Sequence, residues 1–285
     1  TVARTLAWDP TDAAPAWFVD NNGFGARYLR RADIRWINLG TGPGATRLIG
    51  GTQPAAPRFR VCGYCGHLDS EAGANSRRDH RPWCPHTTAD EEPSIHVALG
   101  RALSTEGVLL YLPPAVSTYD TMVLPSLTAA LRLGFRRVLG GDPDHLDVAT
   151  VTVPQLGTPS PALLLHDTVP GGTGYLADFT TPERVWDLLH TAYVAVRDCS
   201  CADENRMACP RCLLAHASGE ADRTSRAAAE NALLALLRGA DRSDDAEPNR
   251  EDWTVVTTQT IDPEGDSQLE VRFRHGLTRI LEDEG

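Results

Sequence analysis

The sequence contains no lysine, because all 27 of its basic residues are arginines. A P-loop nucleotide-binding site needs a lysine that reaches the β- and γ-phosphates of the bound nucleotide. The absence of lysine therefore excludes a P-loop NTPase within these 285 residues.

Long hydrophobic runs are also missing, and none approaches the roughly 20 residues that a membrane-spanning helix requires. The chain starts without an initiator methionine and without the charged-then-apolar pattern of a secretory signal. Its content of 41% hydrophobic and 23% charged residues is ordinary for a globular protein. We therefore expect a cytoplasmic chain that is a fragment of a longer protein.

The net charge of −11 disfavours a free-standing nucleic-acid-binding protein held by nonspecific phosphate contacts. Residues 1–60 differ from the rest, since they contain eight arginines against four acids. Both an anion-binding surface and a solvated face with scattered arginines fit this pattern.

Four cysteines fall within fourteen residues of the second half of the chain, at Cys199, Cys201, Cys209 and Cys212. Four thiolates this close in sequence suit a tetrahedral structural zinc site. Two disulfide bonds without a metal are the alternative, but a Cys-x-Cys bridge strains disulfide geometry and nothing else indicates a secreted protein. Redox-active thiols are a further alternative, which four clustered thiols disfavour.

The other three cysteines, Cys62, Cys65 and Cys84, form an earlier group. With His80 as a fourth ligand, their spacing is C-x2-C-x14-H-x3-C. This spacing is close to that of a zinc finger in which the last histidine is replaced by cysteine. His86 and His67 are rivals to His80 for the fourth ligand position. The alternative is that the three cysteines are buried without binding a metal, beside histidines that face solvent.

A Gly-rich segment follows the apolar run that ends at His166 and Asp167. Its placement between a strand and a helix is that of an active site or an anion site. The alternative is a tight structural turn in which Asp167 caps backbone N–H groups and glycines supply positive φ, and we favour it. The turn residues are His166, Asp167, Pro170, Gly171, Gly172 and Gly174.

Hydrophobic periodicity predicts an α+β fold: a mixed sheet with packed helices, a zinc-stabilised helical subregion and a small β-rich N-terminal part with a zinc finger. Expected helices span 125–139, 182–198 and 224–237, with a shorter one at 174–180. Expected strands span 34–39, 108–112, 147–153, 162–165 and 254–258. We expect a β-rich segment at 1–93 with its finger at 62–86, a zinc-bearing domain at 94–238, an acidic linker at 239–252 and the start of a further domain at 253–285.

The block from Leu165 to Gly174, the helix after it, and the two cysteine pairs with their neighbours Asp198 and Leu213 carry a family resemblance. Over about residues 95–238 the chain resembles the MrfA-type zinc-binding domain, the C-terminal domain of certain superfamily 2 DNA helicases. Related domains occur in the DrmB component of DISARM phage-defence systems. The segment 267–285 resembles the start of a nuclease-like domain found in some of these helicases.

The resemblance implies that Cys199, Cys201, Cys209 and Cys212 bind one zinc ion, and the finger brings the expected total to two. It also implies a non-catalytic accessory domain that helps an ATP-dependent helicase engage or guide DNA, in repair or in phage defence. The chain lacks a DExH box as well as a Walker A motif, so the motor domains belong to the same protein or to a partner. Candidate DNA contacts are Arg27, Arg30, Arg31 and Arg35.

Three questions stay open at this point. A protein-interaction scaffold and a metal-dependent hydrolase that uses His166 and Asp167 are alternative functions. The sequence also does not choose between single-stranded and double-stranded DNA.

Overall fold

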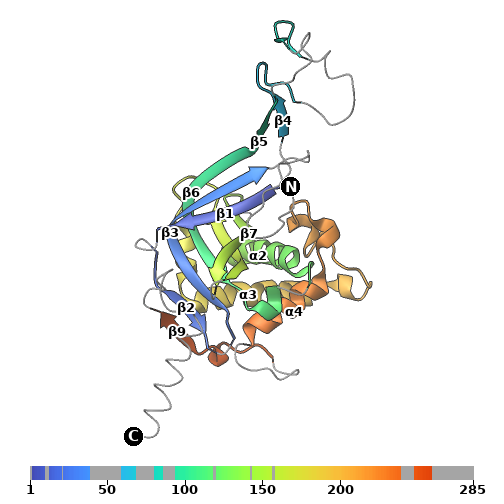
Figure 1. The fold of residues 1–285 in the computed structure, drawn as a ribbon. Helices are drawn as coiled ribbons and strands as arrows, with labels where there is room; N and C mark the ends of the chain where they lie inside the picture. The colour runs from blue at the N-terminus through green and yellow to red at the C-terminus, as the bar shows by residue number, and fades with distance from the viewer. Residues whose placement is uncertain are drawn as a thin grey trace. The chain divides into compact units, whose positions relative to one another are not determined.

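The structure is a computed structural model, and it describes residues 2–9, 13–20, 22–38, 59–68, 80–85, 94–117, 120–141, 143–155, 158–238 and 247–258 (Figure 1). These residues belong to two compact units. Unit 1 comprises Thr1–Thr5 and Arg35–Ala102, and unit 2 comprises Leu6–Ile34 and Leu103–Gly285. His86 and the predicted nuclease-like segment at 267–285 lie outside the described residues.

Seven strands of the described chain form one sheet in the order β7-β8-β6-β3-β2-β9, with β1 paired to β3. The pairs β7–β8, β6–β8, β2–β3 and β2–β9 are antiparallel. The strands are β1 (Val2–Trp8), β2 (Ala16–Val19), β3 (Gly25–Asn38), β6 (Leu99–Tyr111), β7 (Leu146–Gln155), β8 (Thr158–Asp167) and β9 (Val255–Thr258).

Strand β8 illustrates why these residues form an interior strand. Leu163 and Leu165 belong to the main hydrophobic core, and the intervening Leu164 is fully buried on the opposite face. A strand that is buried on both faces reads as a continuous apolar run, which is how its sequence appears.

In unit 2, helices α2, α3 and α4 pack against one another on one side of the sheet (Figure 1). Gly134 permits a close approach of α2 to α3, because a Cβ atom there would lie 3.1 Å from the Cβ of Ala192. Helix α3 begins with Pro182 after Thr181, whose hydroxyl accepts a hydrogen bond from the N–H of Arg184. The α-helices are α1 (Pro114–Ser117), α2 (Val123–Leu139), α3 (Pro182–Arg197) and α4 (Arg226–Leu237).

Unit 1 has a small sheet of its own, and short 3₁₀ segments occur between the larger elements of the chain. Strands β4 (Phe59–Cys62) and β5 (Ser94–Val97) pair antiparallel, with Val61 opposite Ile95. The 3₁₀ segments are η3 (Tyr175–Thr180), η4 (Ser200–Ala202), η5 (Leu214–His216), η6 (Ala221–Arg223) and η7 (Arg250–Asp252).

The predicted α+β class is confirmed, with an antiparallel sheet, several helices and two Cys/His clusters. The predicted helices at 125–139, 182–198 and 224–237 correspond to α2, α3 and α4 within about two residues. The predicted short helix at 174–180 is the 3₁₀ segment η3. None of the helices in the described part of the chain combines the length and hydropathy that a bilayer span requires.

The predicted domain boundaries stay a prediction, and the strands of the sheet come from several of the predicted segments. Strands β2 and β3 from the N-terminal part join the same sheet as β6 and β8. At the other end, β9 pairs with β2, and Trp253 packs its ring 6.1 Å from that of Trp17. Residues from three distant parts of the sequence therefore share the seven-stranded sheet.

Candidate metal centres

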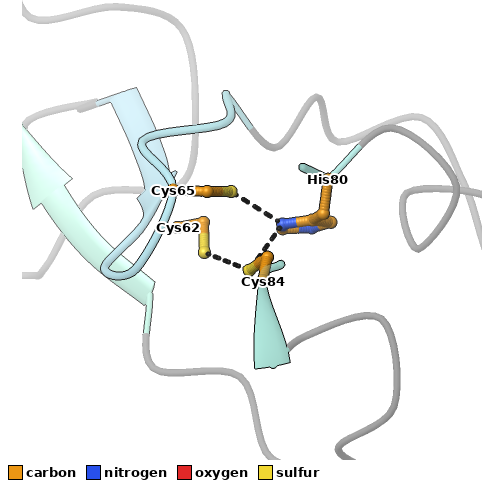
Figure 2. A group of neighbouring side chains, drawn as sticks. All are labelled: Cys62, Cys65, His80 and Cys84. Carbon is orange, nitrogen blue, oxygen red and sulfur yellow. Dashed lines mark hydrogen bonds between the residues drawn. The ribbon is translucent and has the colours of Figure 1, made fainter. Parts of the chain in front are cut away.

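The first cluster lies in unit 1, where the structure brings together Cys62, Cys65, His80 and Cys84 (Figure 2). One ligand atom from each residue lies within 4.8 Å of all the others. The Sγ atom of Cys65 is 3.2 Å from Nδ1 of His80, and the Sγ atoms of Cys62 and Cys84 are 3.7 Å apart. A single ion at the centre of this group would contact three sulfur atoms and one nitrogen atom.

Two tight turns hold these ligands. Gly66 adopts a left-handed φ of 71° and donates its N–H to the carbonyl of Cys62, which closes the turn around Cys65. Tyr64 donates its N–H to the sulfur of Cys62 at 3.4 Å. In the second turn, Cys84 donates its N–H to the carbonyl of Arg81 at 2.8 Å. Both turns depend on local backbone contacts, which is why the sequence spacing predicts them.

His80 is the histidine that the structure places in this cluster. The ring of His67 lies 4.9 Å from that of His80, beside the cluster instead of within it. Although burial raises the pKa of the Cys65 thiol, hydrogen bonds from the backbone of His67 and Arg81 and from the His80 side chain lower it to about 6. The thiolate that a metal requires is therefore favoured at Cys65.

The second cluster lies in unit 2 and gathers Cys199, Cys201, Cys209 and Cys212, again with all ligand atoms within 4.8 Å of one another. Cys199 follows the end of α3, and Cys201 lies in η4. Cys201, Cys209 and Cys212 are buried within the main hydrophobic core, and Cys199 packs against it.

The sulfur positions fit zinc. The Sγ atoms of Cys199 and Cys209 are 3.5 Å apart, and those of Cys201 and Cys212 are 3.7 Å apart. Four sulfurs at about 2.3 Å from a tetrahedral centre would be about 3.8 Å from one another, whereas a disulfide requires about 2.05 Å. All seven cysteines are free of disulfide bonds. The two four-residue clusters thus fit two zinc ions.

Burial and hydrogen bonds shift the pKa values of two late cysteines in opposite directions. Burial, and then hydrogen bonds with Cys199 and Cys212, raise the pKa of Cys201. For Cys209, burial raises the pKa, but hydrogen bonds from the backbone of Cys212, the Cys199 side chain and the backbone of Arg211 lower it to about 7. Four thiolates need a compensating cation at such distances, so ionisation of the whole group is linked to metal binding.

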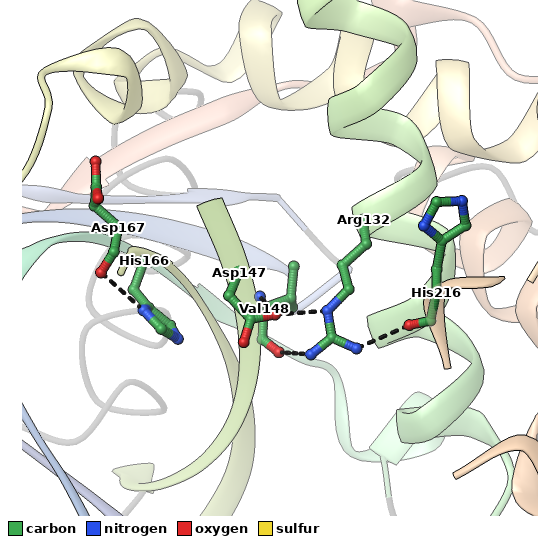
Figure 3. A network of polar contacts seen from close by, with 6 residues as sticks. All are labelled: Arg132, Asp147, Val148, His166, Asp167 and His216. Atoms are coloured by element: carbon green, nitrogen blue, oxygen red, sulfur yellow. Dashed lines mark hydrogen bonds and ion pairs between the residues drawn. The ribbon is translucent and has the colours of Figure 1, made fainter. Parts of the chain in front are cut away.

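Arg132 ties the loop after the late cluster to the sheet (Figure 3). From α2, its guanidinium donates to Asp147 Oδ1 at 2.6 Å and to the backbone carbonyls of Val148 and His216 at 2.9 Å each. His216 ends η5, four residues beyond Cys212. A single side chain therefore connects a helix, an edge strand and the metal-bearing loop.

The Gly-rich turn is organised by two buried carboxylates. Asp167 accepts hydrogen bonds from the N–H groups of Val169 at 2.7 Å and Thr173 at 2.8 Å, and from the Thr173 hydroxyl. Glu106 on β6 accepts from the N–H of Gly174 at 2.6 Å and from the hydroxyl of Tyr28 at 3.0 Å. The carboxylate oxygens are occupied in holding the backbone of the turn.

Several predicted turn residues adopt the geometry that the turn requires. Gly171, Gly172 and Gly174 all have φ between 83° and 86°. His166 is buried with Nδ1 3.0 Å from the carbonyl of Asp167, and Pro170 is exposed (Figure 3). Sequence reasoning missed Glu106, for which the only signal is a single acid that precedes the apolar end of a strand.

The four candidate arginines all lie on β3 but differ in exposure. Arg30, Arg31 and Arg35 are exposed, and Arg31 lies 3.6 Å from Asp33. Arg27 is only 5% exposed, and its Nε has no hydrogen-bond partner. Three of the four side chains are therefore at the surface, and the fourth is buried.

Comparison with known proteins supports the resemblance found in the sequence. Residues 127–213 match the family model of the MrfA Zn-binding domain, a range that contains all four late cysteines. No curated protein matches the chain. Among solved structures, it is similar to the helicase chain of the "Crystal Structure of DUF1998 helicase MrfA bound to DNA", with 14% sequence identity and a TM-score of 0.42. The similarity covers 75% of this chain and 22% of that one.

Proposed function

We propose that this chain is a non-catalytic, zinc-binding accessory domain of an ATP-dependent DNA helicase, and that it helps the motor engage or guide DNA. The observation that carries the proposal is the closed group of four thiols, at Cys199, Cys201, Cys209 and Cys212, inside a segment that matches the MrfA Zn-binding domain. We assign the first ion to Cys62, Cys65, His80 and Cys84.

A structural role for zinc follows from the donor sets. Four protein ligands fill a tetrahedral site and leave no position for water or substrate, so the ion would supply a cross-link between chain segments. The residues of the chain then do the positioning. Cys209 and Cys212 hold one loop against the end of α3, and Arg132 fixes the continuation of that loop to β7.

No observation favours the hydrolase alternative. Asp167 and Glu106 accept hydrogen bonds from the backbone of the Gly-rich turn, which supports a structural role for both carboxylates. Replacement of Asp167 by Asn offers the direct test, because a hydrolase would lose turnover with an intact melting temperature.

The exposed arginines on β3 suit contact with phosphates. Arg30, Arg31 and Arg35 present guanidinium groups to solvent, where they can exchange counterions for a DNA backbone. Because Arg27 is buried, we no longer place it among the DNA contacts. Arg27 is an arginine on the same strand, so a substitution there serves as the control for the three exposed arginines.

The test is DNA binding by fluorescence anisotropy over a range of salt concentrations. The wild-type affinity should fall steeply as salt rises, and each of Arg30→Ala, Arg31→Ala and Arg35→Ala should reduce the slope of log K against log salt by roughly 0.9 per lost duplex contact. Arg27→Met should leave the slope unchanged. Binding that ignores salt, or no binding to any DNA, would favour a protein-interaction scaffold. The repair or phage-defence context, the cytoplasmic location and the source of the motor domains remain predictions.

A further inference from the structure

Exposed apolar side chains are concentrated in unit 1. The described residues contain eight exposed large hydrophobic side chains, and five of them belong to this smaller unit. Two of the five are aromatic, with Tyr64 56% exposed and Trp83 67% exposed. The five are Tyr64, Leu68, Trp83, Ile95 and Leu99.

Tyr64 and Trp83 are distinguished by their attachment to the first metal cluster. Each is one residue before a cluster cysteine, Cys65 and Cys84 respectively. The backbone of both turns is pinned, since Tyr64 donates its N–H to the sulfur of Cys62 and Cys84 donates its N–H to the carbonyl of Arg81. The ligand atoms of the two turns lie within 4.8 Å of one another, so both aromatic side chains project from one small, fixed body.

The sequence that carries the two turns is weakly basic. Residues 59–85 contain four arginines, Arg60, Arg77, Arg78 and Arg81, against three acids, Asp69, Glu71 and Asp79. Arg81 is exposed two residues before Trp83. Two exposed aromatic rings, one of them two residues from an exposed arginine, on backbone held by hydrogen bonds, suit a ligand that combines flat ring faces with negative charge.

We propose that Tyr64 and Trp83 form a stacking platform for unpaired bases of single-stranded DNA. Bases within a duplex are stacked on one another and do not offer their faces, whereas those of a single strand do. The platform rests on the proposed function, and it specifies the form of DNA that the first cluster takes. Arg81 would face the phosphates that flank the stacked bases.

The experiment compares two fluorescent oligonucleotides of equal length, one of thymidines and one whose backbone carries no bases. Both present the same phosphates, so their difference in affinity isolates stacking. The full chain should bind the thymidine oligonucleotide more tightly. Trp83→Ala should weaken that binding by about tenfold, Tyr64→Ala should weaken it by several-fold, and neither should change binding to the abasic strand. Trp83→Phe should retain most of the affinity.

Tyr175→Ala is the matched control, because Tyr175 is 50% exposed and lies in unit 2. It should leave both affinities unchanged. Zinc content and melting temperature should stay at wild-type values in all variants, since each altered side chain is exposed and binds no metal.

The outcomes separate this inference from the proposed function. If the wild type binds no DNA, both fail. If it binds the thymidine and abasic strands equally, or if Trp83→Ala and Tyr64→Ala keep full affinity because the patch docks a protein, DNA engagement stands and the stacking platform is overturned. An equal loss on both strands in Trp83→Ala would also overturn it.

Discussion

The two metal clusters differ in the buried side chains that surround them. Among the residues of unit 1 whose side chains the structure describes, the buried ones are Cys62, His80 and Cys84, all of them cluster residues. In unit 2, three of the four late thiols are embedded in an extensive apolar core built from α2, α3, α4 and one face of the sheet. In the part of unit 1 that the structure describes, the cluster residues therefore supply the buried contacts, whereas the second cluster reinforces an apolar core.

This difference predicts what each ion contributes. Among the described side chains of unit 1, no apolar one outside the cluster is buried, so little there offsets the conformational entropy of folding and the order of the two turns depends on the metal. Unit 2 has further anchors that involve no metal, namely Arg132 and the buried carboxylates Glu106 and Asp167.

The largest effect is expected from a reciprocal pair of cysteine variants. Cys212→Ser should lose one of two zinc ions and destabilise unit 2 by more than about 4 kcal/mol, because it opens the late site and places a hydroxyl in the apolar core. Cys84→Ser, which is similarly buried, should also lose one zinc but leave the main thermal transition within about a degree. Metal analysis and thermal unfolding of both variants provide the measurement.

One result for the two cysteine variants would contradict the contrast between the clusters. If Cys84→Ser lowered the main transition as far as Cys212→Ser does, the first ion would be stabilising far more than its own turns. The contrast between the two cores would then be lost.

Sequence reasoning succeeded where the governing contacts are local. Cysteine spacing identified both clusters, and periodicity found α2, α3 and α4, because each pattern is complete within about twenty residues. It missed Arg132 and Glu106, whose partners His216 and Gly174 are 84 and 68 residues away.

Charge pattern alone also misplaced Arg27 among the exposed arginines. Only the first residues of β3, from Gly25 to Arg27, are buried at consecutive positions, so both faces are covered there and no alternation in the sequence marks Arg27 as inward-facing. The resemblance to the MrfA-type domain is confirmed over residues 127–213, a shorter range than the sequence motifs suggested.

Arg132→Leu should separate the metal from the other anchors of unit 2. The change removes an ion pair with Asp147 and leaves the carbonyls of Val148 and His216 without their donor, so we expect a loss of about 2–3 kcal/mol with two zinc ions retained. Urea unfolding together with metal analysis provides the measurement. Arg137→Leu, an exposed change on the same helix, should cost less than about 0.5 kcal/mol. Loss of zinc from Arg132→Leu would contradict the separation.

The Gly-rich turn offers a matched pair of glycines. A Cβ atom on Gly172 would lie 2.5 Å from Cγ of the buried Glu106, whereas one on Gly171 meets nothing within 4 Å. Both residues have a left-handed φ, so Gly171→Ala should cost about 1 kcal/mol and Gly172→Ala about 2 kcal/mol. Equal losses in the unfolding free energies of the two variants would show that the Glu106 side chain is not fixed and shifts to accommodate the added Cβ atom.

The smallest effect concerns the hydroxyl of Tyr28, which donates to Glu106. Burial and this hydrogen bond raise the pKa of Tyr28 from 10.0 to about 12. The neutral hydroxyl therefore contributes fully below pH 10, the unfolded value, and its contribution disappears as pH rises through 12. Tyr28→Phe should lose about 1 kcal/mol or less at pH 8, and this deficit should shrink and disappear as pH rises from 10 toward 12, in urea unfolding measured across that range. A difference that persists above pH 12 would mean that Tyr28 acts through packing alone, and Glu106 would then have only the N–H of Gly174 to connect the turn to the sheet.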